Sequence, residues 1–184
     1  MNAPGDQPTA ATAIYPMAPL IRFTLISLYL ALVLPLPVLA PPGLQPWLWA
    51  ALPIGLAVIL ALVSERVELG GVDIRVGHPS WCAWLLRRGW TLQWAEITGL
   101  TPVATSQGGR VFYVRTKTGS AYLLPQRVQA FPEFLSRFSH HTGLDTSSIG
   151  RISPPWTYQL LAVLCGLMLA GEGLWLLAGP AVAG

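Results

Sequence analysis

The stretch that decides the fold is Trp47–Val76, WLWAALPIGLAVILALVSERVELGGVDIRV. Its first part, Trp47–Ser64, is an apolar run close to the length of about 20 residues that a membrane-crossing helix needs. The period changes at Glu65, where apolar residues begin to alternate and Gly70-Gly71 separates two short strand-like segments. The stretch therefore predicts a membrane helix followed directly by a β-rich polar domain.

Two further apolar runs lie outside this stretch, Met17–Ala40 before it and Trp156–Ala178 near the end of the chain. The three runs enclose a polar segment, roughly 65–155, that holds ten of the 11 Lys and Arg residues. Charged residues make up only 10% of the chain, against about 25% in an ordinary soluble domain. We expect an integral membrane protein with three spans and one small water-facing domain.

The first run also has features of a secretory signal, because small residues near Ala40 resemble a cleavage region. The run is longer than the apolar core of most signal peptides, however, and the second run follows within about seven residues. We therefore expect residues 17–64 to form an uncleaved transmembrane helical hairpin that turns at Pro41-Pro42-Gly43.

Positive charges predict the orientation, because Lys and Arg near the ends of spans stay in the cytoplasm. Arg66, Arg75 and Arg151 flank the runs on the domain side, whereas the loop Pro41–Pro46 has no charge. We expect the domain and the N-terminus to face the cytoplasm. Residues 1–16 are then a flexible tail, 147–155 a linker, 156–178 the third span and 179–184 a short tail on the opposite side.

The polar domain is expected to contain short strands followed by one helix. The expected strands are Val67–Leu69, Val72–Val76, Trp81–Leu86, Trp90–Trp94, Ile97–Ala104, Arg110–Thr116 and Ala121–Leu124. The helix has one apolar stripe, at helical spacing, made of Phe131, Phe134, Leu135 and Phe138. Gly143 suits its C-terminal end. The predicted fold class is membrane α-helical plus a small mostly-β domain, residues 65–146, in which a bent sheet or split barrel is closed by one C-terminal helix.

Residues 65–145 also carry a recognisable order of features. These are the segments Gly71–Val76, Trp94–Ile97, Val111–Val114 and Ala121–Leu124 and the helix Phe131–His141. The order resembles the bacterial PH-like domains that are attached to membrane hairpins. This resemblance implies a PH-like fold and an interaction or assembly role without enzyme activity. Two helices before such a domain also resemble the layout of a small photosystem I assembly factor of thylakoid membranes, from which the third helix departs.

The sequence shows no pattern for catalysis, a metal or a cofactor. His140 and His141 are adjacent on the expected helix, so their side chains diverge by about 100°, whereas metal ligands favour i, i+4 spacing or further partners. The glycine pairs lack the pattern of a phosphate loop, and no serine stands in a nucleophile elbow. No basic run is longer than the pair Arg87-Arg88, and the other basic residues are spread singly, which argues against nucleic acid as a partner. We expect a protein that is not an enzyme and has no cofactor.

The segment WCAWLLRR, residues 81–88, is the first candidate contact, because it is aromatic and apolar at its start and basic at its end. Its candidate residues are Trp81, Trp84, Arg87 and Arg88, to which Lys117 adds charge. They suit the headgroups of an anionic inner leaflet. They equally suit a protein partner, because Trp and Arg are frequent in binding hot spots. A buried strand ending in a solvated turn is the third interpretation.

Glu172 is the second candidate, because it is an ionisable residue inside the third apolar run. Glycines on both sides would let another helix approach closely. The sequence leaves two interpretations open, a hydrogen bond to a partner helix and an exposed carboxylate that reaches the headgroups.

These features favour a scaffold or assembly factor whose cytoplasmic PH-like domain binds a protein in a membrane complex. A membrane-anchored, lipid-sensing or regulatory module is the alternative. Either would belong in an inner membrane, cytoplasmic or thylakoid, and self-association is compatible with both.

Overall fold

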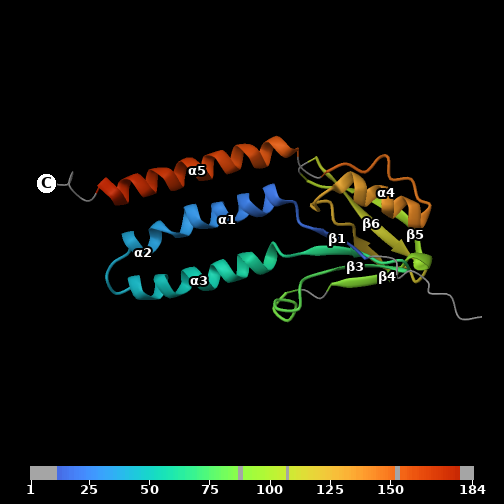
Figure 1. Ribbon diagram of the computed structural model, residues 1–184, viewed down its shortest axis with the longest axis horizontal. Helices are drawn as coiled ribbons and strands as arrows, with labels where there is room; N and C mark the ends of the chain where they lie inside the picture. Colours follow the sequence, from blue (N-terminus) through green and yellow to red (C-terminus); the bar gives the residue numbers. More distant parts are fainter. Residues whose placement is uncertain (1–11, 87–88, 107, 152–153, 179–184) are drawn as a thin grey trace, which may run out of the picture. The chain divides into compact units, whose positions relative to one another are not determined.

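The computed structural model describes residues 12–86, 89–106, 108–151 and 154–178 (Figure 1). These residues form two compact units that each draw on two separate parts of the chain. Residues 12–16 and 65–151 form a β-rich domain, and residues 17–64 and 154–178 form a helical unit. The domain is therefore interrupted in sequence by the hairpin, which we did not expect.

The helical unit contains α1 (Pro19–Val33), α2 (Pro35–Leu39), α3 (Gln45–Leu62) and α5 (Pro155–Ala178). Pro35 cannot donate a backbone hydrogen bond, which explains the break between α1 and α2. Taken with α2, α1 is one of three helical segments that are long and apolar enough to cross a membrane, together with α3 and α5. The three expected runs therefore form helices that are compatible with a membrane protein.

Polar contacts inside this unit join α1 to both other long helices. The Tyr29 hydroxyl donates a 2.7 Å hydrogen bond to the carbonyl of Leu52 on α3. Gly55 makes room for the Tyr29 ring, because a Cβ atom there would collide with its hydroxyl. The Thr24 hydroxyl lies 3.4 Å from the carbonyl of Tyr158 on α5. Such contacts satisfy polar groups that an apolar environment would otherwise leave unpaired.

The first sheet of the domain is antiparallel, with the order β1 (Ala13–Pro16), β2 (Arg66–Leu69), β3 (Asp73–Gly77) and β4 (Trp90–Gln93). In its register, Ala13 pairs with Leu69 and Pro16 with Arg66. The expectation of a flexible tail is therefore wrong for residues 13–16, whereas residues 1–11 lie outside the described residues. The pairing partners of β1 are about 50 residues away, on the far side of the hairpin.

The second sheet is antiparallel, with the order β5 (Ile97–Ala104), β6 (Arg110–Thr116) and β7 (Ala121–Leu123). A single 3₁₀ turn, Trp94–Glu96, links β4 to β5. The turns beside β6 use glycine at positive φ, 77° at Gly108 and 82° at Gly119, where other residues are strained. Six of the seven expected strands are confirmed to within a residue or two.

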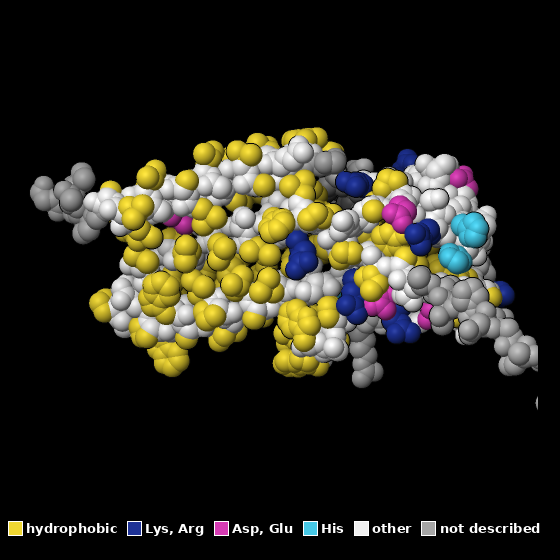
Figure 2. All heavy atoms as spheres, in the orientation of Figure 1, with side chains coloured by type: hydrophobic (Ala, Val, Ile, Leu, Met, Phe, Trp, Pro, Cys, Tyr) yellow, Lys and Arg dark blue, Asp and Glu magenta, His cyan; other side chains and the backbone are white. Residues whose placement is uncertain are grey.

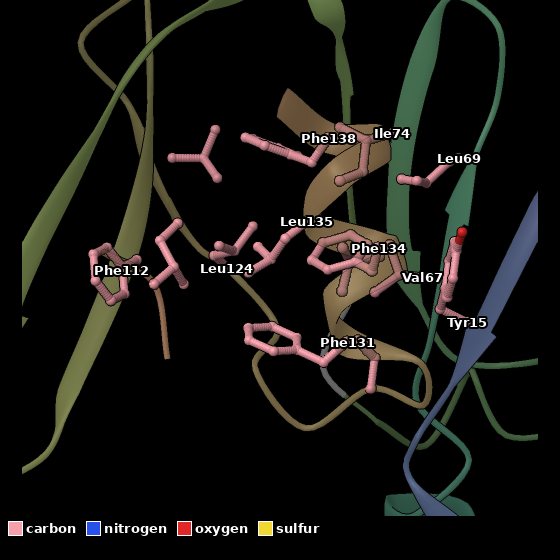
Figure 3. Packing of buried hydrophobic residues seen from close by; sticks show 14 of the residues in the cluster. Tyr15, Val67, Leu69, Ile74, Phe112, Leu124, Phe131, Phe134, Leu135 and Phe138 are labelled. Carbon is pink, nitrogen blue, oxygen red and sulfur yellow. The ribbon is translucent and has the colours of Figure 1, made fainter. Parts of the chain in front are cut away.

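The helix α4 (Phe131–Thr142) supplies the centre of the domain core (Figure 3). Its apolar stripe points between the two sheets, with Phe112 and Leu124 on one side and Val67 and Ile74 on the other. The helix ends at Gly143, which has a φ of 70°, as its sequence position indicated. The expected arrangement, a β-rich domain with one C-terminal helix, is thus confirmed at this level.

Two segments of the domain differ from expectation, residues 147–151 and residues 81–86. Ile149 is buried in the domain core, and the buried Gln126 side chain donates hydrogen bonds to the carbonyls of Arg110 and Gly150. The segment 147–151 is therefore fastened to the domain instead of serving as a free linker. Residues Trp81–Leu86 are not a strand: they form successive turns between β3 and β4.

Candidate interaction sites

The first candidate site is the turn Pro79–Leu86, here called the Trp turn. Backbone hydrogen bonds close it, because the amides of Cys82 and Ala83 donate to the carbonyl of Pro79 and that of Leu85 to the carbonyl of Cys82. Cys82 is buried, and its thiol lies 3.5 Å from the carbonyl of Pro79 within the same turn. The Trp84 indole donates a 2.9 Å hydrogen bond to the carbonyl of Trp81, so the tip supplies its own acceptor.

The tip of the Trp turn is unusually apolar for a surface. Trp81 is 56% exposed and Trp84 is 81% exposed, and Leu85 beside them is half exposed. Figure 2 shows the resulting cluster of hydrophobic side chains, at the place where Figure 1 draws the connection between β3 and β4. The buried-strand interpretation is therefore wrong for both tryptophans. Arg87 and Arg88, the other residues of this candidate site, lie outside the described residues.

Lys117 does not join this site. It lies in the turn between β6 and β7, where its amide donates a 3.0 Å hydrogen bond to the carbonyl of Glu96. Glu96 follows the end of β4, whereas the Trp turn precedes the beginning of β4. The structure therefore separates Lys117 from the tryptophans by the length of the first sheet.

The outer face of the second sheet is a candidate that we did not predict. Phe112 and Val114 of β6 point into the core, so Val111 and Tyr113 point to the opposite face. The strand register places Val103 opposite Val111 and Leu123 opposite Tyr113. Val103 is 43% exposed and Leu123 is 48% exposed. The four apolar residues of β6 in a row, Val-Phe-Tyr-Val, were the available signal, because such a run indicates two apolar faces.

Glu172 lies in the helical unit and lines a cavity of about 300 Å³. The other lining residues are apolar or glycine and come from α5 and from the region of α2: Leu34, Pro35, Val38, Leu39, Gly171, Trp175 and Leu176. The Glu172 Oε2 atom is buried and has no hydrogen-bond partner among the described residues. One oxygen of the Glu172 carboxylate therefore points into the helical unit. This position does not fit a side chain that extends entirely outward toward headgroups.

Two titratable side chains of the domain, His141 and Tyr15, pack against its aromatic residues. The His141 ring stacks on Trp94, with centroids 4.7 Å apart and planes 5° apart, and desolvation lowers the pKa of His141 below its ordinary 6.5. The Tyr15 hydroxyl donates to Glu133 Oε1 at 3.0 Å, and burial together with this bond raises the pKa of Tyr15. No cluster of three or more metal-ligating side chains occurs within the described residues.

Comparison with known proteins finds a relative in a cyanobacterium, Synechocystis strain PCC 6803. The chain is 41% identical to its uncharacterised protein slr0269 over 165 residues, which cover 86% of this chain and 83% of the relative. This chain belongs to the slr0269 family. The alignment extends over more residues than either unit contains, so the family shares parts of both the domain and the helices. No family model and no solved structure matches the chain.

Proposed function

We propose that this member of the slr0269 family is an integral membrane scaffold or assembly factor. In this proposal α1–α2, α3 and α5 span the membrane, and the β-rich domain lies in the cytoplasm and binds a protein partner. A cyanobacterial relative is consistent with an inner membrane, either cytoplasmic or thylakoid. The scarcity of charge between residues 17 and 64, against the many Lys and Arg of the domain, supports the orientation.

A PH-like fold for the domain is part of the proposal. The domain has a four-stranded sheet, then a three-stranded sheet, then one helix at the C-terminal end whose stripe fills the space between them. This element order fits the resemblance found in the sequence. It also fits a binding module, because the buried side chains pack the core and leave the strand surfaces and turns for contacts.

The outer face of the second sheet is the observation that carries the protein-binding proposal. Val103, Val111, Tyr113 and Leu123 form one contiguous apolar area across three strands. Exposed apolar patches of this kind mark interaction surfaces on soluble domains. Arg115 lies on the same face, and its Nε donates a 3.1 Å hydrogen bond to the Thr101 hydroxyl. The partner we propose is therefore a protein surface with an apolar centre and a carboxylate near its rim.

The test is a charge placed at the centre of this face. Leu123→Asp should leave the domain folded, because surface changes usually alter stability by about 0.5 kcal/mol or less. It should nevertheless abolish a membrane complex that the wild-type chain forms on blue-native gels and in mild-detergent purification. Val72→Asp is the matched control, because Val72 is an exposed apolar residue in the β2–β3 turn, away from this face.

Equal complex formation by the Leu123→Asp chain and the wild type would contradict the proposal. Loss in the Val72→Asp chain as well would also contradict it, because the effect would then not depend on the face. The lipid-sensing alternative draws on a different observation, the exposed tryptophans of the Trp turn.

A further inference from the structure

The Trp turn stands at one particular end of the first sheet. The register pairs Pro16 with Arg66 and Arg66 with Gly77, and it pairs Val76 with Trp90. The last residue of β1, the first of β2, the last of β3 and the first of β4 therefore meet at this end. The Trp turn is the connection from β3 to β4 and projects from it.

The same sheet end is where the chain passes into the helices. Only Met17 and Ala18 separate β1 from α1, and residues 63–65 separate α3 from β2. Met17 and Val63 are already buried in the hydrophobic cluster of the helical unit. Connections of this length extend by no more than about 10 to 15 Å. If α1 and α3 cross a membrane, these short connections hold this end of the sheet close to the membrane surface.

The side chains at the tip suit that surface. Trp is enriched where the headgroups meet the hydrocarbon, because its ring is apolar and its N–H can hydrogen-bond. Trp81 and Trp84 expose their rings to solvent, and Leu85 beside them exposes an apolar side chain. The turn at the far end of the domain, Lys117-Thr118-Gly119-Ser120, is polar, as expected of a turn in water.

We infer that the Trp turn is an interfacial anchor: Trp81, Trp84 and Leu85 enter the headgroup region of the bilayer that the helices cross. The occupant of this apolar surface is therefore lipid, and the protein partner binds elsewhere on the domain. The inference rests on the proposed function in one respect, that the helices span the membrane. An anchor beside two short connections fixes the tilt of the domain, and thereby the direction in which its binding face points.

Spin labels on introduced cysteines test the inference in the full chain. The native Cys82 and Cys165 are both buried, and the unmodified chain shows any background labelling. Leu85→Cys reports on the Trp turn and keeps both tryptophans, Leu167→Cys reports on the middle of α5, and Lys117→Cys is the aqueous control. The chains are reconstituted in vesicles of three parts phosphatidylcholine to one part phosphatidylglycerol. Collision rates with oxygen and with a water-soluble nickel chelate then give the depth of each label.

We expect the Leu85 label to lie between the other two in depth, with nickel accessibility at least fivefold below that of the Lys117 label. Adding Trp84→Ala should shift the Leu85 label toward water. Equal nickel accessibility at Leu85 and Lys117, with the Leu167 label in lipid, would overturn the inference and leave the spanning helices intact. A water-accessible Leu167 label would instead overturn the spanning proposal and the inference with it. Protection of the Leu85 label in native membranes alone would identify a protein as the occupant and would also overturn it.

Discussion

Tyr15→Ala is the sharpest test of the interrupted domain, because Tyr15 belongs to the strand that precedes the hairpin. Tyr15 is 5% exposed and packs edge-to-face on Phe134, with ring centroids 5.7 Å apart. Removing a buried aromatic ring costs about 3–5 kcal/mol, and the lost hydrogen bond to Glu133 adds about 0.5–1.5 kcal/mol. A domain of this size has a free energy of unfolding of about 5–14 kcal/mol. The change should therefore remove a large share of its stability.

Hydrogen exchange of the β2 amides is the suitable assay, because it reports on the domain separately from the helices. A loss of at least 3 kcal/mol corresponds to exchange about a hundredfold faster at equal pH. Tyr15→Phe should produce less than about a tenfold increase, because it removes only the hydrogen bond. Ile14→Ala is the matched control on the same strand, since Ile14 is 55% exposed. Exchange in the Tyr15→Ala chain within about threefold of the Ile14→Ala chain would refute the place of β1 in the core.

Two further predictions concern single ionisable residues. His141 should titrate below pH 6.5 in proton NMR, because its ring is partly desolvated beside Trp94. As the pH falls, His141 therefore takes up its proton in the unfolded domain before it does so in the folded domain. The domain loses stability as the pH falls from 6.5 through the pKa of folded His141. His141→Gln should remove that part of the pH dependence, and an unchanged profile would show that the stacking has no such effect. Glu172→Leu should insert into membranes at least as well as the wild type, because an acid within a span raises the free energy of insertion by up to about 2.5–3.5 kcal/mol. The Glu172→Leu chain should nevertheless lose the native complex, whereas the Glu172→Gln chain should retain much of it. Normal migration of the Glu172→Leu chain on blue-native gels would exclude a partner for this carboxylate.

The sequence predicted the elements whose signals are local. The helix α4 has a stripe, a proline in its first turn and a C-terminal glycine, and it was found within one residue of its expected end. The strands β5 and β6 were predicted with their observed bounds, because glycine-containing turns mark their ends. The three apolar runs likewise became helices, since length and composition decide that question.

The prediction was wrong where the deciding contact is distant in sequence. Nothing in Ala13–Pro16 itself distinguishes a strand from a tail, because its partner strand lies beyond the hairpin. Ile149 was assigned to a linker because two isoleucines among polar, glycine and proline residues show no clear period. The apolar residues Trp81–Leu86 favoured a strand, yet local backbone hydrogen bonds close them into turns that expose both tryptophans. The hydrophobic period of a segment can be read from its own residues, whereas its burial depends on which distant residues fold against it.

The interrupted sheet has a consequence for how the protein is made. At about 5–20 residues per second, β1 is synthesised some 3–10 s before its partner β2. During that interval β1 has no partner strand, and, if the hairpin spans a membrane as proposed, it must also be inserted. Pro16 can then reach Arg66 only if both ends of the hairpin emerge on the same side of the bilayer. Under the proposed topology, the first sheet can therefore close only in chains whose first two helices have both crossed the bilayer, and a chain with one crossing too few is left with an incomplete domain.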